Sequence, residues 1–202
     1  MNGEINLKGW NQIIFNLIVN KFQNTKFTTS DIYRYIPEFK KVYPNNNYIE
    51  EKIRQTLQKL RDKKIVKFID KGICQLIPEY KKETVEAKEK KNTRDFVYLM
   101  SNESIPGWIK IGRTNSITKR VRQLNTGAPL PFIVEKTIET HSAYDSLTLE
   151  KTIHAMIDTI NPNVRKNTAA SKREFFMLTI DQAIKIFDLV VKINQTEINK
   201  NI

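Results

Sequence analysis

Residues 96–120 read FVYLMSNESIPGWIKIGRTNSITKR, and this stretch decides the fold of the second half of the chain. Two short runs within it, residues 96–100 and 108–112, are rich in β-branched and aromatic side chains, and Ser, Asn, Pro and Gly separate them. That composition is typical of a β-hairpin with an irregular loop. A basic segment with helical character follows from Ser116 to about Asn125. We therefore expect two paired strands that lead directly into a helix.

Three side chains of this stretch suit chemistry on a phosphate group. Tyr98 and Lys110 lie one on each expected strand, and Arg120 lies on the expected helix. A phenol, an ammonium group and a guanidinium group that meet in one place can bind a phosphate and stabilise the charge that develops during its transfer. The ordinary alternatives are a core tyrosine, a solvated lysine and an arginine in a surface ion pair.

The pattern resembles that of the GIY-YIG nuclease family. Residues 97–98 stand where the family has I-Y, residues 110–112 stand where it has Y-I-G, and Arg120 falls at the spacing of its helical arginine. Phe96 replaces the first glycine of the family pattern. Lys110 replaces its second tyrosine, as in some restriction-type and phage-type branches that carry K-I-G there.

Two downstream runs extend the resemblance, which covers about residues 95–190. They are LEKTIH at 149–154 and REFF at 173–176. The resemblance implies a domain with a small mixed or antiparallel sheet flanked by helices, and it implies hydrolysis of phosphodiester bonds. Glu174 in the second run would position Arg120 or a second water. The conserved asparagine of the family has no clear counterpart, and its candidates are Asn161, Asn163 and Asn167.

The resemblance also implies a role for each candidate catalytic residue. Tyr98 would deprotonate or orient the attacking water, and Lys110 beside it would favour the phenolate. Arg120 would bond the scissile phosphate. Glu150 would hold one Mg²⁺ or Mn²⁺ ion per active site, with water and phosphate completing the oxygen shell. His154, one helical turn after Glu150, would orient a water or contact the phosphate, and its alternative is a structural histidine.

The whole chain is strongly basic, with a net charge of +12 and a pI near 9.7. This balance indicates a polyanionic partner, with nucleic acid as the first choice and an anionic membrane surface as the second. Residues 1–78 are the more basic part, with 14 Lys and Arg against 7 Asp and Glu. No apolar run approaches the roughly 18 residues of a transmembrane helix. A single cysteine, Cys74, excludes an intrachain disulfide and a structural zinc cluster. We expect a cytoplasmic protein.

Periodicity and capping signals predict three helices and then a β-hairpin in the basic half. Ser30 and Asn47 are the expected caps of the second and third helices, and Pro37 would end the second helix or start a new turn. Three helices followed by a hairpin form a winged helix-turn-helix. The helices are expected at about residues 7–22, 31–36 and 48–63, and the strands at 65–69 and 73–77.

This half resembles the C-terminal winged helix of DpnI, a restriction enzyme that requires methylated adenine, and of Dam-replacing proteins. The resemblance covers about residues 10–76 and rests on the blocks YPNNN at 43–47 and KIRQ at 52–55. It implies recognition of double-stranded DNA, including adenine-methylated DNA, through the third helix. Trp10 is the candidate methyl sensor because an indole offers a large, rigid apolar surface. The candidate DNA contacts are Trp10, Asn47, Lys52, Arg54, Gln55, Gln58 and Lys59, with Arg113 and Arg122 in the other half.

Together these patterns predict an α/β (α+β) chain with a winged helix at 1–78, a charged linker at 79–94 and a GIY-YIG nuclease at 95–202. The expected function is sequence-specific, metal-dependent cleavage of DNA by a type II restriction endonuclease, as a monomer or a homodimer. Two alternatives stay open. One is a mobile-element or phage endonuclease that reads unmodified DNA, and the other is a non-cleaving repressor on a degenerate nuclease scaffold.

Overall fold

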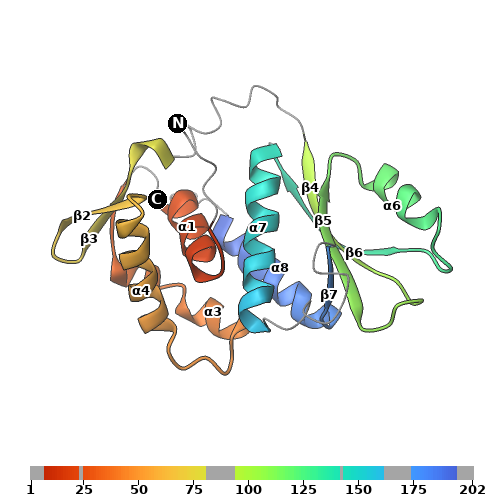
Figure 1. Cartoon of the computed structure of the whole chain (residues 1–202), viewed down its shortest axis with the longest axis horizontal. Helices are drawn as coiled ribbons and strands as arrows, with labels where there is room; N and C mark the ends of the chain where they lie inside the picture. The colour runs from red at the N-terminus through yellow and green to blue at the C-terminus, as the bar shows by residue number, and fades with distance from the viewer. Residues whose placement is uncertain (1–6, 23–24, 81–93, 142, 162–173, 195–202) are drawn as a thin grey trace, which may run out of the picture. The chain divides into compact units, whose positions relative to one another are not determined.

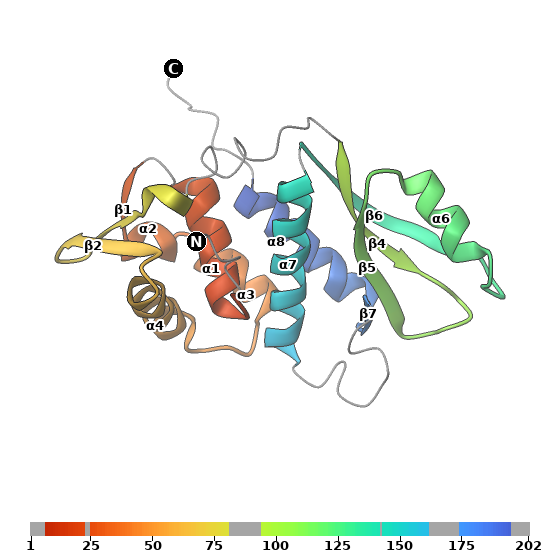
Figure 2. The same ribbon diagram turned by 45° about the horizontal axis from the view of Figure 1, so that its top comes forward.

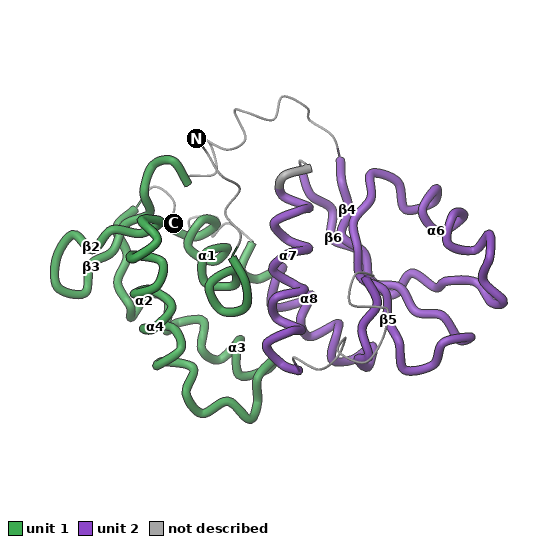
Figure 3. Tube along the Cα trace, in the orientation of Figure 1, with its two compact units in different colours: residues 1–88, 192–202 green, residues 89–191 purple. Residues whose placement is uncertain are grey.

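The structure, a computed structural model, describes residues 7–22, 25–80, 94–141, 143–161 and 174–194. The chain divides into two compact units, residues 1–88 with 192–202 and residues 89–191, which are coloured separately in Figure 3. The described residues form seven α-helices, one 3-10 helix and two antiparallel sheets, which confirms the mixed α+β class. None of these helices combines the length and hydrophobicity needed to cross a bilayer. The expected linker lies almost entirely outside the described residues, and the domain boundaries stay a prediction.

The first unit contains four α-helices and a three-stranded sheet in the order β1-β3-β2 (Figure 1). Its helices α1 and α4 pack against each other and bury Leu17, Ile53 and Leu60. Helices α1, α2 and α4 and the β2–β3 hairpin correspond to the expected three helices and wing, while α3 is a fourth helix that was not expected and β1 adds a third strand. In chain order the elements are α1 (Trp10–Lys21), β1 (Lys26–Thr28), α2 (Thr29–Tyr33), α3 (Ile36–Val42), α4 (Ile49–Asp62), β2 (Val66–Asp70), β3 (Ile73–Leu76) and η1 (Pro78–Tyr80).

The start of α2 corrects the expected cap at Ser30. The N-cap is Thr28, whose Oγ1 accepts the Asp31 N–H at 3.2 Å, while the Asp31 carboxylate accepts the Thr28 N–H at 2.8 Å. This reciprocal capping box satisfies two backbone donors that the first turn leaves without partners. The backbone hydrogen bond from Thr28 also lowers the pKa of Asp31. Pro37 starts a new turn, as one of the two alternatives expected, because it lies in the first turn of α3.

The start of α4 corrects the expected cap at Asn47. The helix begins one residue later than that cap requires, and Tyr48 occupies the N-cap position without a side-chain hydrogen bond. The Tyr48 N–H donates instead to Oδ1 of Asn46 at 2.9 Å. From there α4 is amphipathic as expected, and its buried residues are Ile49, Ile53, Thr56, Leu57 and Leu60.

The second unit is built on a four-stranded antiparallel sheet in the order β6-β4-β5-β7. Figures 1 and 2 show α6 on one face of this sheet and α7 with α8 on the other. Helix α7 contacts β4, β5 and β6. The elements are β4 (Asp95–Ser101), β5 (Trp108–Thr114), α6 (Ile117–Asn125), β6 (Ile133–Thr140), α7 (Ala143–Ile160), β7 (Phe175–Met177) and α8 (Ile180–Asn194).

The register of this sheet separates a core face from a site face. Val97, Leu99 and Ile111 belong to the core face and are completely buried. Tyr98 pairs with Gly112, and Met100 pairs with Lys110, so Tyr98 and Lys110 share the opposite face because alternate strand residues point to opposite sides. Arg120, on α6, donates a hydrogen bond to Tyr98 on this face. The expected hairpin and the helix that follows it are therefore both present, and they bring the candidate phosphate-binding residues together on one face of the sheet, where Tyr98 and Lys110 are buried.

Candidate functional site

The site face gathers the three residues that the hairpin pattern singled out. The Nε of Arg120, on α6, donates to Oη of Tyr98 at 3.0 Å. The Nζ of Lys110, on β5, donates to Oε2 of Glu174 at 3.0 Å. The same carboxylate oxygen lies 3.7 Å from Nη2 of Arg120 and 3.5 Å from Oη of Tyr98. Two cations and a phenol therefore converge on one oxygen of Glu174, which immediately precedes β7.

Gly112 makes this convergence possible. A Cβ atom at residue 112 would lie 2.5 Å from Oε2 of Glu174 and 2.6 Å from Oη of Tyr98. Both distances are shorter than real Cβ contacts allow. Gly112, the glycine of the K-I-G run, does not have a positive φ. It is needed here because it lets the Glu174 and Tyr98 side chains approach the backbone closely.

Glu150, on α7, brings a second carboxylate to the cluster. It is only 8% exposed, and burial raises its pKa to about 7, helped by the negative charge of Glu174. The Nε of Arg113 lies 3.5 Å from Oε2 of Glu150, and its Nη1 lies 3.7 Å from Oδ2 of Asp95. Asp95 in turn accepts a hydrogen bond from Oγ of Ser146 at 2.8 Å. Arg113, expected to contact DNA, is thus placed to hold the Glu150 carboxylate.

The electrostatics of Tyr98 correct one expectation. Lys110 was expected to favour the phenolate, but its ammonium group pairs with Glu174 instead. Burial raises the pKa of Tyr98 to about 12, although the hydrogen bond from Arg120 acts in the opposite direction. The charges of Glu174 and Glu150 raise this pKa further. Tyr98 is therefore a protonated hydroxyl near neutral pH.

Glu150 and Glu174 are the carboxylates of this site that could contribute to a cation shell, and the metal itself stays a prediction. Burial and the neighbouring carboxylate of Glu174 disfavour the ionised form of Glu150. A bound hard cation would supply the positive charge that stabilises this form. The described residues contain no cluster of three His, Cys, Asp or Glu side chains able to hold a metal ion. Water and a phosphate oxygen would therefore complete the shell around Glu150, which is a common arrangement for Mg²⁺.

The remaining candidates in this unit occupy different surroundings. The ring of His154, one turn after Glu150, packs on the ring of Phe176 with 4.9 Å between centroids. Arg122 is exposed on α6. Of the asparagine candidates, Asn161 is exposed at the end of α7, and residues 163 and 167 lie outside the described ranges.

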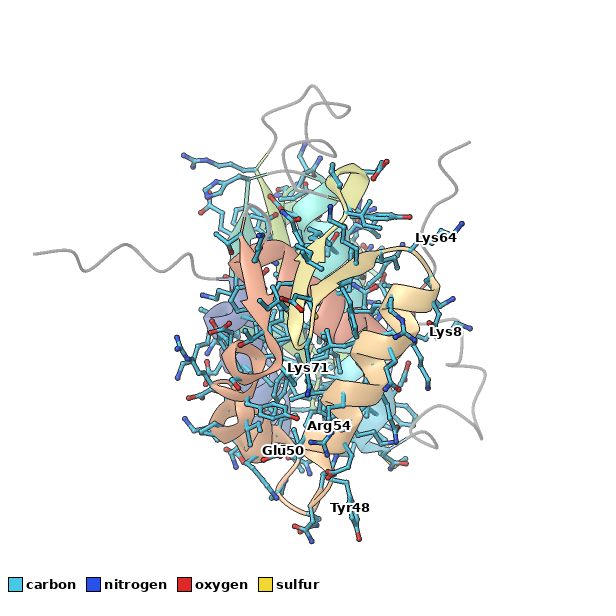
Figure 4. The ribbon with its side chains drawn as sticks, turned by 90° about the vertical axis from the view of Figure 1, so that its left-hand side faces the viewer. Lys8, Tyr48, Glu50, Arg54, Lys64 and Lys71 are labelled. Carbon is cyan, nitrogen blue, oxygen red and sulfur yellow. The ribbon has the colours of Figure 1, made fainter. Side chains whose placement is uncertain are left out.

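The polar face of α4 carries the expected DNA contacts of the first unit. Lys52, Arg54, Gln55, Gln58 and Lys59 are all exposed. Figure 4 shows the labelled Arg54 and Tyr48 beside α4, on the side of the unit where Lys71 marks the hairpin turn. Arg54 is held in place, because its guanidinium donates to Oη of Tyr33 at 3.2 Å and to Oε1 of Glu51 at 2.9 Å. Asn47 is exposed just before the helix and accepts a hydrogen bond from Lys40 at 3.3 Å.

Trp10 opens α1 and packs among aromatic side chains. Its ring centroid lies 5.4 Å from that of Phe39 and 5.2 Å from that of Tyr43. The indole is half-buried, so part of it contributes to the core and part remains accessible. Its role as a methyl sensor stays a prediction.

Two features of the site had no clear sequence signal. Glu174 was expected to position Arg120, whose Nη2 lies 3.7 Å from the Glu174 Oε2, but the contacts of Glu174 with Lys110 and Tyr98, 64 and 76 positions away, had no sequence signal. Tyr48 is 69% exposed. It occupies the N-cap position of α4, just before the first helical residue Ile49, and the sequence did not predict where this helix begins to the residue.

Two family models match the chain, one in each half. Residues 6–76 match the family described as the Dam-replacing HTH domain, and residues 95–191 match the family described as the T5orf172 domain, which is nuclease-associated. The first match supports a DNA-binding winged helix in the N-terminal half, which suggests DNA as the partner of that half. The second supports a nuclease-like domain in the C-terminal half, where the GIY-YIG resemblance itself stays a prediction.

Proposed function

We propose that the chain is a sequence-specific, divalent-metal-dependent DNA endonuclease of the GIY-YIG type that acts as a type II restriction enzyme on adenine-methylated DNA. The observation that carries the proposal is the convergence of Tyr98, Lys110 and Arg120 on one oxygen of Glu174. Groups that bind an anionic carboxylate oxygen can bind a phosphate oxygen in the same place. A winged helix on the same chain would deliver the DNA.

In the proposed mechanism, the two cations bind the phosphate and the phenol orients the water. Lys110 and Arg120 would stabilise the charge that develops on the phosphate oxygens in the transition state. Only roughly 10⁻⁴ of a phenol with a pKa of about 12 is ionised at pH 8. Tyr98 therefore acts chiefly as a hydroxyl that holds the attacking water in line, and Arg120 fixes the direction of that hydroxyl through its hydrogen bond.

Glu150 would hold the Mg²⁺ or Mn²⁺ ion, and Arg113 would hold the Glu150 carboxylate in place. When bound, the cation would neutralise charge on the phosphate and assist the departing oxygen. The phosphate would take the place of the Glu174 carboxylate oxygen beside Lys110 and Arg120, since both anions would bind the same two cations. One such centre cuts one strand, so a double-strand break requires a homodimer or two successive events.

The test is a plasmid nicking assay with Mg²⁺, on adenine-methylated and unmethylated plasmid, with the wild type and two variants. Glu150→Ala removes the cation ligand, and Tyr98→Phe removes only the hydroxyl. We expect each to lower the cleavage rate by about a thousandfold or more, the size of such catalytic contributions, while gel-shift affinity for DNA stays unchanged. The exposed Glu103 provides the control variant Glu103→Ala, which keeps the wild-type rate.

Two outcomes would contradict this assignment. Full cleavage by either active-site variant would exclude the mechanism. Tight DNA binding by the wild type without any Mg²⁺- or Mn²⁺-dependent nicking would favour the non-cleaving repressor instead.

A further inference from the structure

An apolar surface adjoins the cluster of charged side chains on the same face of the sheet. Val134, Met100, Lys110 and Phe175 form one row across β6, β4, β5 and β7. They point to the same side because directly paired residues share a face. Trp108 pairs with Met177 one row further along, on that same face. The site face therefore changes from charged to apolar within one row of the sheet.

This apolar end is accessible, unlike the opposite face of β5 and β7 at the same level. Met177 is 57% exposed and Val134 is 38% exposed, and Phe175 is half-buried. Met100 and Lys110, which lie between Val134 and Phe175 in the row, are buried. Ile109 and Phe176, the neighbours on the core face, are at most 2% exposed. Exposed apolar groups grouped beside a polar site are typical of ligand-binding surfaces.

A second aromatic ring is fixed above this surface by the end of α6. The Phe132 N–H donates to Oδ1 of Asn125, the last residue of α6, at 2.8 Å. The Nδ2 of Asn102 donates to the Leu130 carbonyl at 2.6 Å in the same loop. The rings of Phe132 and Phe175 lie 6.3 Å apart between centroids and are tilted by 53°. Because their backbones are anchored, the two rings are organised before any ligand arrives. Phe132, Val134, Phe175 and Met177 are called the aromatic shelf below.

Lys110 connects the aromatic shelf with the charged cluster. Its Nζ lies 3.0 Å from Glu174 Oε2 on one side and 4.7 Å from the centroid of the Phe175 ring on the other. A phosphate held by Lys110 would bring its attached nucleotide over that ring. The surroundings are basic, since α6 also carries Lys119 and Arg122. Cationic side chains that alternate with accessible aromatic rings are the composition that binds unpaired nucleotides.

We propose that the aromatic shelf binds the nucleobase next to the phosphate held by Lys110 and Arg120, and that this unit prefers DNA with an unpaired nucleotide at the cleaved bond. A base inside a duplex has both faces covered by its neighbours, so it reaches Phe175 only after it leaves the stack. Leaving the stack costs least at a mismatch or in a single strand. The inference deepens the proposed endonuclease function and rests on it.

The test measures binding by the full-length chain carrying Glu150→Gln, so that DNA is not cut. The probe is a short single-stranded oligonucleotide with one 2-aminopurine, whose fluorescence is quenched when the base stacks on an aromatic ring. We expect quenching on binding. Phe175→Leu and Phe132→Leu keep apolar volume but remove a ring, so each should weaken single-strand binding by roughly tenfold and reduce the quenching. Ile133→Ala is the control, because Ile133 pairs with Ser101 on the other face and is comparably exposed.

Folding of each variant is checked by circular dichroism, and a second readout uses the cleavage-competent chain. It should cut a duplex with a mismatch at the cut site faster than the fully paired duplex, and Phe175→Leu should reduce that difference. Unchanged single-strand affinity and quenching in both folded ring variants would overturn the proposal. A ring variant that sediments as a smaller species than the wild type would also overturn it, because the shelf would then be an interface between two copies of the chain. Absence of all nicking by the wild type would contradict the endonuclease function, while the binding readout would still decide on the shelf.

Discussion

At the scale of single residues, Glu150 links stability to pH. Its pKa is about 7 in the folded chain against 4.5 for an ordinary carboxyl, because burial and Glu174 disfavour the ionised form. Between these values the folded state binds one proton more than the unfolded state, so the free energy of unfolding falls as pH rises. This loss of stability begins as pH rises above 4.5, the pKa in the unfolded chain, and is complete above about 7, the pKa in the folded chain. It amounts to about 3 kcal/mol.

Glu150→Gln should remove this pH dependence. Without divalent cations, we expect the variant to be more stable than the wild type at pH 8 and about equally stable at pH 4, measured by urea denaturation with EDTA present. Glu103→Gln, an exposed site, is the control and should follow the wild type at both pH values. A wild type that gains stability relative to Glu150→Gln between pH 5 and pH 8 would show that the carboxyl is not buried as described.

The same titration predicts the pH dependence of cleavage at limiting Mg²⁺. Cation binding requires the ionised carboxylate, so the rate should rise from pH 6 to pH 8 through the region near pH 7 set by Glu150. Saturating Mg²⁺ should move this rise to lower pH, because the cation stabilises the ionised form. A rate that is independent of pH at limiting Mg²⁺ would speak against Glu150 as the ligand.

At the scale of elements, β5 carries a glycine that cannot be replaced without moving the site. In Gly112→Ala, the new methyl group would displace the Glu174 carboxylate and the Tyr98 hydroxyl. Misplacement of reacting groups by about 1 Å costs on the order of a hundredfold in rate, so we expect at least that loss in the nicking assay. Gly127→Ala is the matched control, since a Cβ at Gly127 meets no heavy atom within 4 Å. Equal rates for the two variants would mean that the Tyr98 and Glu174 positions do not matter for cleavage.

Helix α4 is the element expected to read the bases. Arg54 is oriented by Tyr33 and Glu51, and an arginine whose direction is fixed loses less side-chain entropy on binding guanine. Arg54→Ala and Gln55→Ala should each reduce the discrimination between the preferred and a scrambled duplex by roughly 1–3 kcal/mol. Arg61→Ala, in the last turn of the same helix, is the control and should weaken both duplexes alike. Competition gel shifts measure the difference, and unchanged discrimination in both α4 variants would assign the reading to another element.

At the scale of the whole molecule, we expect the winged helix to give the chain its preference for adenine-methylated over unmethylated duplex. A methyl group on adenine gains free energy only from a dry apolar surface, on the order of 1 kcal/mol for each methyl. Two methyls in a palindrome should therefore tighten the binding of methylated duplex by about tenfold or more. In the full chain, Trp10→Ala should remove this preference. Phe39→Leu, which alters a packing partner of Trp10 but keeps the indole, should retain it. Circular dichroism shows whether both variants fold, and equal binding of both duplexes by the wild type would refute methyl dependence.

The sequence by itself determined most of the elements, though not α3, and most of the residues of the candidate site. Strand alternation, helical periodicity and capping residues are local properties of the chain, so the β4–β5 hairpin, α6 and α4 follow from short windows. Tyr98, Lys110 and Arg120 fall within 23 positions of one another, and the hairpin register decides that the first two share a face. The helix caps were less certain because Thr28 and Ser30, or Asn46 and Asn47, offer the same side-chain chemistry within two residues.

Only the tertiary structure decided how the candidate site is arranged. Glu174 reaches Lys110 and Tyr98 because β7 lies beside β5, a long-range pairing that no local pattern encodes. Burial is likewise a property of the assembled fold, and it reverses the expected effect on Tyr98 by raising its pKa to about 12. Arg113 is still exposed, and its contact with DNA stays a prediction. Its contact with Glu150 also arises from the assembled fold, since α7 approaches β5 only when the sheet and its helices pack together.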